Sequence, residues 1–270
     1  MRSSFTKQAF ELHSDIRLPF EPKGEALALK EEIRRSLKFL NLFEYNHLNA
    51  RLITSEKDFF DVENILFYNV GLGAFSHLML DEISFSLEYD SNSPSNKYTY
   101  SYELTSKVTS EEINDVILEF SFELDKMTSD MKPLDYWHAL NQGHIKISKL
   151  MNPNEFGLSI VIETPEKHRN ITSLLKPLID GLISAFHYQN SVNQEILDYI
   201  AKKKYISEDV VLSQLRGKDY TFLGERNLVS MYRDGIKWNP EDEKCTKINM
   251  KQIKGLSKTI KVYGRVYLLK

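Results

Sequence analysis

Apolar residues recur at helical steps in one N-terminal segment and alternate with polar residues in several others. Between residues 24 and 40, Ala26, Leu29, Ile33 and Leu37 share one side of a helix, which predicts an amphipathic helix. Alternation and short apolar runs, typical of strands, predict strands at residues 10–18, 48–53, 82–90, 97–104, 144–150 and 259–269. The turn-forming run at residues 92–96 predicts that the strands on either side of it form a hairpin.

Further segments are assigned from caps and apolar content. Thr109 and Glu112 form a capping box, and apolar residues at helical spacing follow, so a helix is predicted to continue to residue 124. Residues 157–163, GLSIVIE, are apolar enough for a central strand. Residues 171–186 are apolar over far more than one stripe, which predicts a helix buried on most sides. Two shorter helices are predicted at residues 192–203 and 208–216.

Together these elements predict an α+β fold, with a mixed or antiparallel sheet packed on a central buried helix at residues 171–186. A strand, a proline turn and a long helix occur at residues 10–40 and again at 157–188. This echo favours two similar halves, an N-terminal α+β half at 1–128 and a C-terminal α+β half at 129–270. One continuous domain is the alternative.

Composition narrows the class of protein. The 270 residues include 35 basic and 38 acidic side chains in mixed order, so no strong nucleic-acid signature is present. No apolar stretch is long enough for a membrane span or a signal-peptide core. The single cysteine, Cys245, cannot form an intramolecular disulfide, which favours the reducing cytoplasm. We therefore expect a soluble, cytoplasmic protein.

The first candidate site is the segment Asp61-Val62-Glu63-Asn64. In an extended segment, Asp61 and Glu63 would lie on one face and could bind a divalent cation through oxygen ligands. The alternative is structural, with Asp61 as the N-cap of a helix that enters the apolar run at residues 65–67.

The second candidate is Lys176 and Asp180, an i,i+4 pair within the apolar segment. Burial of both charges is costly unless they are paired or functional. They could instead mark the solvent-facing edge of the helix. Gly181, which follows directly, suggests that another backbone approaches closely.

The third candidate is the loop after Trp238, with the acids Glu241 and Asp242. Trp238 beside these carboxylates could form a ligand rim, and Arg226 and Arg233 could complement an anionic substrate. A core tryptophan next to a solvated turn is the alternative. Cys245 lies between Lys244 and Lys247, which could lower its pKa. The histidine spacings predict no zinc site.

No catalytic constellation stands above its structural alternative, so a non-catalytic binding or assembly protein without a cofactor is the first functional hypothesis. Its partner would be a protein, either a second copy or another chain. The alternative is a metal-dependent hydrolase acting on phosphoesters or nucleic acid, with acids gathered around Mg²⁺ or Mn²⁺. The hydrolase requires that its acidic residues converge in space: Asp61, Glu63, Asp180, Glu241 and Asp242.

Overall fold

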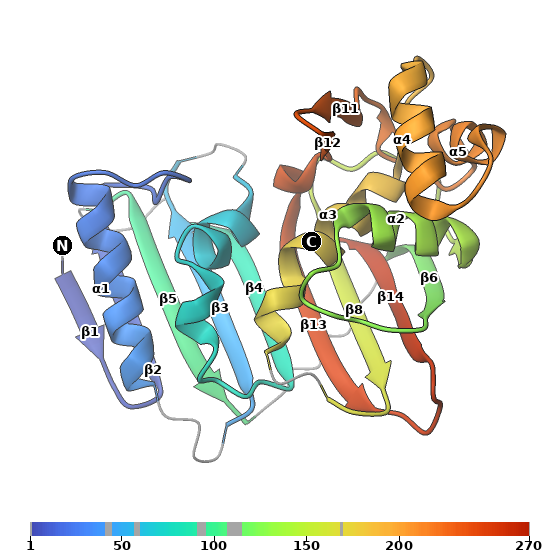
Figure 1. Ribbon diagram of the computed structural model, residues 1–270. Helices are drawn as coiled ribbons and strands as arrows, with labels where there is room; N and C mark the ends of the chain where they lie inside the picture. Colours follow the sequence, from blue (N-terminus) through green and yellow to red (C-terminus); the bar gives the residue numbers. More distant parts are fainter. Residues whose placement is uncertain are drawn as a thin grey trace.

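The computed structural model describes residues 2–40, 45–56, 60–90, 96–106, 115–167 and 170–269. Its α-helices are α1 (Glu25–Phe39), α2 (Pro133–Gln142), α3 (Leu175–Ala185), α4 (Gln194–Lys204) and α5 (Glu208–Leu215) (Figure 1). Shorter helical segments are the π-helix η1 (Asn64–Tyr68) and the 3-10 turns η2 (Leu72–Phe75), η3 (Ile171–Leu174) and η4 (Asp242–Lys244).

The main sheet has ten strands in the order β1-β2-β5-β3-β4-β13-β8-β14-β6-β7. These strands are β1 (Arg2–Phe5), β2 (Ala9–Ser14), β3 (His47–Thr54), β4 (Glu82–Tyr89), β5 (Tyr98–Thr105), β6 (Val116–Leu124), β7 (His144–Ile147), β8 (Phe156–Thr164), β13 (Cys245–Lys254) and β14 (Ile260–Leu268). Two small pairs complete the strands: β9 (His187–Tyr188) with β10 (Gly224–Glu225), and β11 (Val229–Tyr232) with β12 (Gly235–Trp238). Helices beside a mixed sheet confirm the predicted α+β class.

The strand order repeats within the sheet. The neighbours β2, β5, β3 and β4 are paired antiparallel, antiparallel and parallel in turn. The neighbours β6, β14, β8 and β13 are paired in the same way. The two sets meet where β4 pairs antiparallel with β13, so the halves are related by an approximate two-fold axis through this pair.

This repeat differs from the echo in the sequence, which matched residues 10–40 with 157–188. In the sheet, β2 corresponds to β6 rather than to β8, and α1 corresponds to α2. The strand β6 lies with the C-terminal strands, so the topological division falls before residue 116, upstream of the predicted boundary at 128. The division into domains at residues 1–128 and 129–270 stays a prediction, with one continuous domain as its alternative.

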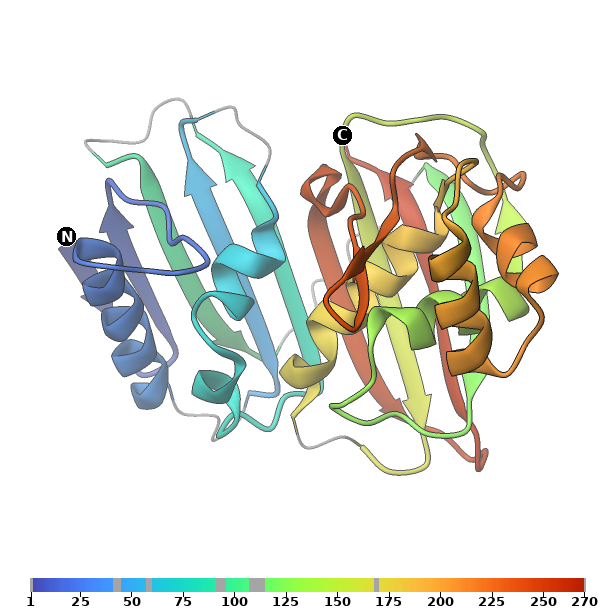
Figure 2. The same cartoon turned by 45° about the horizontal axis from the view of Figure 1, so that its top comes forward.

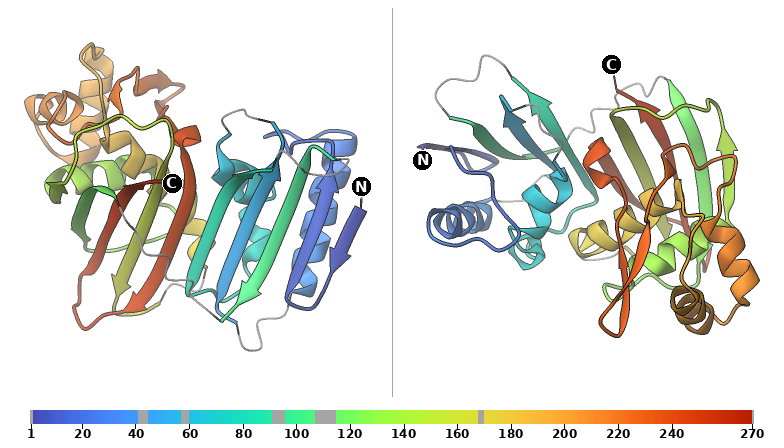
Figure 3. Two further views of the ribbon diagram at one scale, coloured as in Figure 1. Left: turned by 180° about the vertical axis from the view of Figure 1, so that it is seen from behind. Right: turned by 90° about the horizontal axis from the view of Figure 1, so that it is seen from above.

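The α-helices lie on one face of the sheet. Figures 1 and 2 show α1 over the N-terminal strands and α2 and α3 over the C-terminal strands, and the view from behind in Figure 3 shows strands without a covering helix. In β3, β4, β8 and β13, buried positions alternate with half-buried ones. The apolar side chains of these strands therefore form the core beneath the helices.

The helix α3 is buried along most of its length, as its apolar residues require. A 3-10 turn precedes it, and Pro177 falls in the first turn of α3, where its missing N–H breaks no helical bond. Its predicted place as the single centre of the fold is not confirmed, because α1, η1 and η2 cover the other half of the sheet.

Two local predictions are wrong. The strands at 82–90 and 97–104 do not form a hairpin, because β3 lies between β4 and β5. The predicted helix ending at residue 124 is the strand β6 over its described part, since Leu118, Phe120 and Phe122 alternate toward the core; Thr109 and Glu112 lie outside the described residues. Within the described ranges, no helix is both long and apolar enough to cross a membrane.

Candidate functional site

The ammonium group of Lys176, on α3, lies among four carboxyl groups. Lys176 Nζ is 2.9 Å from Asp180 Oδ1, 3.1 Å from Asp61 Oδ2 and 3.1 Å from Asp242 Oδ2. Glu63 Oε2 is slightly farther from it, at 3.6 Å. Residues predicted separately from three parts of the sequence therefore converge, and we call Asp61, Glu63, Lys176, Asp180 and Asp242 the Lys176 cluster.

The local structure of each segment explains how its acidic side chain comes to lie beside the Lys176 ammonium group. Asp61 Oδ1 accepts a hydrogen bond from Asn64 N at 3.0 Å, so Asp61 has the predicted capping role and joins the cluster through its other oxygen. Residues 62–63 are helical rather than extended, and the turn directs Glu63 inward. Asp180 follows Lys176 by one helical turn, and Asp242 begins η4, which leads into β13.

Burial in the cluster is severe. The side chain of Glu63 is 2% exposed, and those of Asp61, Lys176, Asp180 and Asp242 are between 15% and 21% exposed. Neither carboxyl oxygen of Glu63 has a hydrogen-bond partner within the described part of the chain. Asp61 Oδ2 and Asp242 Oδ2 each lie 3.1 Å from Lys176 Nζ, so these two carboxyl groups are close neighbours across the ammonium.

The pKa values of these groups follow from burial. Burial raises the pKa of Asp61 to about 7, with a further contribution from the Asp242 carboxyl, and it raises the pKa of Asp180 to about 6. Burial also raises the pKa of Glu63 well above its ordinary value. For Lys176, burial lowers the pKa, but the surrounding carboxyls outweigh burial and raise it. The lysine therefore stays charged, while Asp61, Glu63 and Asp180 hold their protons to a higher pH than exposed carboxyl groups do.

The cluster has an internal cation where the hydrolase hypothesis requires a metal ion. The Lys176 ammonium occupies the space between the carboxyls. Over the described residues, no group of three or more His, Cys, Asp or Glu side chains is arranged to hold a metal ion. We therefore do not assign these acids as metal ligands.

Other predicted site residues lie outside the Lys176 cluster. Glu241 pairs instead with Arg226 Nη1 at 2.9 Å and with Lys244 Nζ at 2.7 Å, so Arg226 already has a carboxylate partner. Arg233 is exposed in the turn between β11 and β12, with its guanidinium over the Tyr232 ring.

The indole of Trp238 packs on that of Trp137, with ring centroids 5.2 Å apart. Cys245 is buried, and burial raises its pKa well above the ordinary value. The prediction that neighbouring lysines lower the pKa of this thiol is wrong.

A second place of interest is the outer edge of β6, which sequence reasoning missed because this segment was predicted as a helix. The edge strand β7 pairs only with Leu118–Ser121 of β6, so β6 continues past the end of β7. A hollow of about 720 Å³ follows the remaining edge. Its lining comprises residues 121–125, the end of α2, the start of β7 and two β14-side residues, Thr259 and Lys261.

Within the described part of the chain, no strand pairs with residues 122–124 on the β7 side of β6. Ser148 N and Lys149 N donate to Ile117 O, on the β7 side of β6. The carbonyl group of Ser121 faces the same side, because a Cβ atom added at Gly143 would lie 2.4 Å from Ser121 O. Since strand backbone groups alternate sides with a period of two, the N–H and C=O of Glu123 point to that side as well. Ile147, Leu150 and Met151 are exposed along the same border of the sheet.

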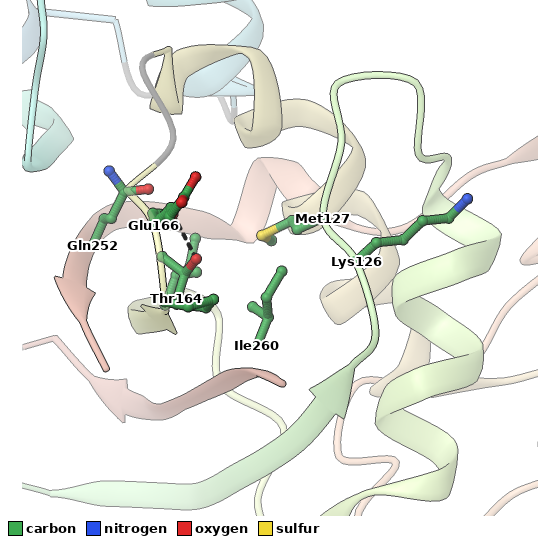
Figure 4. Close-up of a pocket in the computed structure, with 8 residues that line it drawn as sticks. Lys126, Met127, Thr164, Glu166, Gln252 and Ile260 are labelled. Atoms are coloured by element: carbon green, nitrogen blue, oxygen red, sulfur yellow. Dashed lines mark hydrogen bonds between the residues drawn. The ribbon is translucent and has the colours of Figure 1, made fainter. Parts of the chain in front are cut away.

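A smaller hollow, of about 330 Å³, lies at the ends of β8 and β14 (Figure 4). Met127 points toward Thr164, whereas Lys126 points away. Thr164 Oγ1 donates a hydrogen bond to Glu166 O at 2.7 Å, so the hydroxyl group that lines this hollow already has a partner within the protein. None of the candidate residues from the sequence lines it.

Comparison with known proteins adds no assignment: no protein-family model matches this chain, and no curated protein matches it.

Proposed function

We propose that this chain is a non-catalytic binding or assembly protein that takes up an extended segment of a protein partner along the free edge of β6. The observation that carries this proposal is the hollow of about 720 Å³ beside residues 121–125, where β6 extends beyond β7. A free strand edge with outward N–H and C=O groups is a template for another strand.

The chemistry of the hollow suits an extended peptide. Its lining combines the outward backbone of Glu123 with apolar surface from Leu124 and Ala139. Backbone pairing supplies affinity in this mode of recognition, and pockets for alternate side chains supply specificity.

A reducing compartment suits this proposal, because the sole cysteine is buried and unpaired. We propose a cytoplasmic location on this ground. The metal-dependent hydrolase stays a prediction: its acids converge apart from Glu241, but Lys176 lies at their centre.

The test selects binders from a phage-displayed library of random dodecapeptides and compares two variants at one position. Glu123→Pro removes the outward N–H, whereas Glu123→Ala removes only the exposed side chain. Loss of one backbone hydrogen bond and of close approach is expected to weaken binding of the selected peptides about tenfold in Glu123→Pro. Glu123→Ala should bind them with wild-type affinity.

Two further readouts keep the outcome clear. The melting temperature of Glu123→Pro establishes that the variant is folded, since the N–H that it lacks does not bond to β14. In the wild-type protein, the amide of Glu123 should become protected from hydrogen exchange when a selected peptide binds. If selection enriches no peptide, or if the enriched peptides bind Glu123→Pro as tightly as wild type, the proposal fails.

A further inference from the structure

We infer that the Lys176 cluster is a proton-dependent joint, which holds the two halves of the sheet together while its carboxyl groups share protons and loosens as they lose them. The inference is independent of peptide binding at β6. It rests on the position of the cluster, its charge balance and the burial of the Glu63 carboxyl without a hydrogen-bond partner among the described residues.

The cluster lies between equivalent connections of the two halves. Asp61 and Glu63 belong to the connection between the parallel strands β3 and β4. Lys176, Asp180 and Asp242 belong to the connection between the parallel strands β8 and β13, the counterparts of β3 and β4. Because β4 and β13 pair at the approximate two-fold axis, the cluster joins the halves above their shared strand pair.

The charges within the cluster do not balance if every acid is ionised. Four carboxylates around one ammonium would leave three negative charges uncompensated in a largely buried space. Uncompensated buried charge is so costly that such groups take up protons instead. Glu63 is the clearest case, because it is 2% exposed and its carboxyl oxygens have no hydrogen-bond donor among the described residues.

The positions of two of the acids lead to the same conclusion. Asp61 Oδ2 and Asp242 Oδ2 each lie 3.1 Å from Lys176 Nζ, so the two carboxyl groups are close neighbours across the joint. A carboxylate beside another carboxyl group in a buried space is costly, which favours a proton on Asp61.

The surrounding charged groups do not remove this imbalance. Asp61 and Glu63 face the joint from the segment before η1, Lys176 and Asp180 face it from α3, and Asp242 and Glu243 face it from η4. The thiol of Cys245 lies near Asp242 and Asp61. Farther out, Arg226 and Lys244 are paired with Glu241.

The element beside the joint is suited to movement. The helical turn that contains Glu63 continues as the π-helix η1, a rare form that often marks functional sites. Loss of the shared protons would leave like charges on the η1 side and on the η4 side. The segment at residues 61–68 is therefore the part that we expect to separate from α3 and η4.

The sign of the pH effect follows from the raised pKa values. The folded protein holds protons on Asp61 and Asp180 that the unfolded chain has already released, between the ordinary aspartate pKa of 3.8 and folded values of about 7 and 6. Stability from these groups is therefore complete below pH 3.8 and is lost as pH rises toward 7. Each proton retained only by the folded state raises the unfolding constant about tenfold per pH unit over that window.

The experiment measures urea unfolding at pH 5 and pH 7.5 for wild type, for Asp61→Asn/Glu63→Gln and for the control Glu119→Gln. Glu119 pairs with Arg265 on the sheet surface, with Nε 3.0 Å from Oε1. We expect the unfolding constant of wild type and of the control to rise at least tenfold more between these pH values than that of the double variant, whose amides cannot ionise.

Infrared spectroscopy of the folded protein provides the direct readout and needs no variant. At pH 6, wild type should show the carbonyl stretch of neutral carboxyl groups, and this band should weaken on titration to pH 8 as Asp61 and Asp180 lose their protons. If the double variant does not fold, Asp61→Asn alone is used for the unfolding comparison. A wild-type protein without the neutral-carboxyl band at pH 6, or with the same pH dependence as the amide variant, would overturn the inference.

Discussion

Gly181 offers a sharp test of the packing between α3 and α2. A Cβ atom added at this position would lie 2.6 Å from Pro133 O, 2.7 Å from Tyr136 Cβ and 3.1 Å from Trp137 N. Two of these neighbours are backbone atoms, which cannot rotate away as a flexible side chain does. The substitution Gly181→Ala therefore forces the two helices apart by several tenths of an ångström.

Two opposing effects set the magnitude. Alanine is favoured over glycine within a helix by about 1 kcal/mol, which stabilises the variant. Overpacking of a well-filled interior costs about 1–3 kcal/mol. Because the new contacts with Pro133 and Tyr136 are far inside normal separation, we expect the cost to exceed the gain. The free energy of unfolding should fall by about 1–2 kcal/mol, and the melting temperature by about 3–6 °C.

Urea denaturation followed by circular dichroism measures this change. The matched control is Gly73→Ala, because a Cβ atom at Gly73 meets nothing within 4 Å. The control should change the unfolding free energy by less than about 0.5 kcal/mol. A Gly181→Ala variant that is as stable as wild type, or more stable, would refute the close approach of the two helices.

Two more predictions concern Lys176 and Cys245. Lys176→Met removes the cation that faces four carboxyls, so the unfolding free energy should fall by about 3–5 kcal/mol at pH 8. The loss should be smaller at pH 5, where Asp61 and Asp180 carry protons; equal losses in the two urea titrations would contradict this. Cys245 is 1% exposed with a raised pKa, so the native protein should resist iodoacetamide, as measured by mass spectrometry, whereas protein in urea should react. Rapid labelling of the native thiol would show that it is accessible.

The sequence predicted most elements whose apolar residues fit only one spacing, either that of a helix or that of a strand. The helix α1 and the strands β3, β4, β8 and β14 lie where the pattern placed them, to within a few residues. The strand β6 was missed because its apolar residues also fit helical spacing, and the sheet, rather than local preference, decided between the two. Its partner β14 is more than a hundred residues away in the chain.

Pairing was harder to predict than the strands themselves. The turn-forming run between β4 and β5 favours a hairpin, yet β3 pairs with both strands and separates them. Register and neighbour choice depend on which apolar faces meet in the core, and no local signal encodes this. The sequence pattern suggested a repeat, but which strands of the two halves correspond could be established only from the strand order of the sheet.

For the candidate site, too, individual residues could be predicted from the sequence, but their partners could not. An acid and a base in a strongly apolar helix signalled that Lys176 and Asp180 have buried partners, and two of the other acids were also singled out for their spacing. That Lys176 itself would be the common partner, with Glu241 bonded elsewhere, depended on the tertiary arrangement of three distant segments. The close approach of another backbone at Gly181, in contrast, was predicted correctly. Glycine within a helix is destabilising, so its presence there indicates such a contact.

The late position of β13 in the chain has a consequence for biosynthesis. Strands β1 to β5 are complete once residue 105 has left the ribosome, and they can pair among themselves. The strand that pairs with the open edge of β4 is β13, which begins only at residue 245. At translation rates of about 5–20 residues per second, this edge of the nascent chain stays unpaired for on the order of ten seconds. During that interval the unpaired edge of β4 can pair wrongly with other nascent chains on the same messenger RNA. A chaperone that binds nascent chains would prevent this most effectively by covering β4.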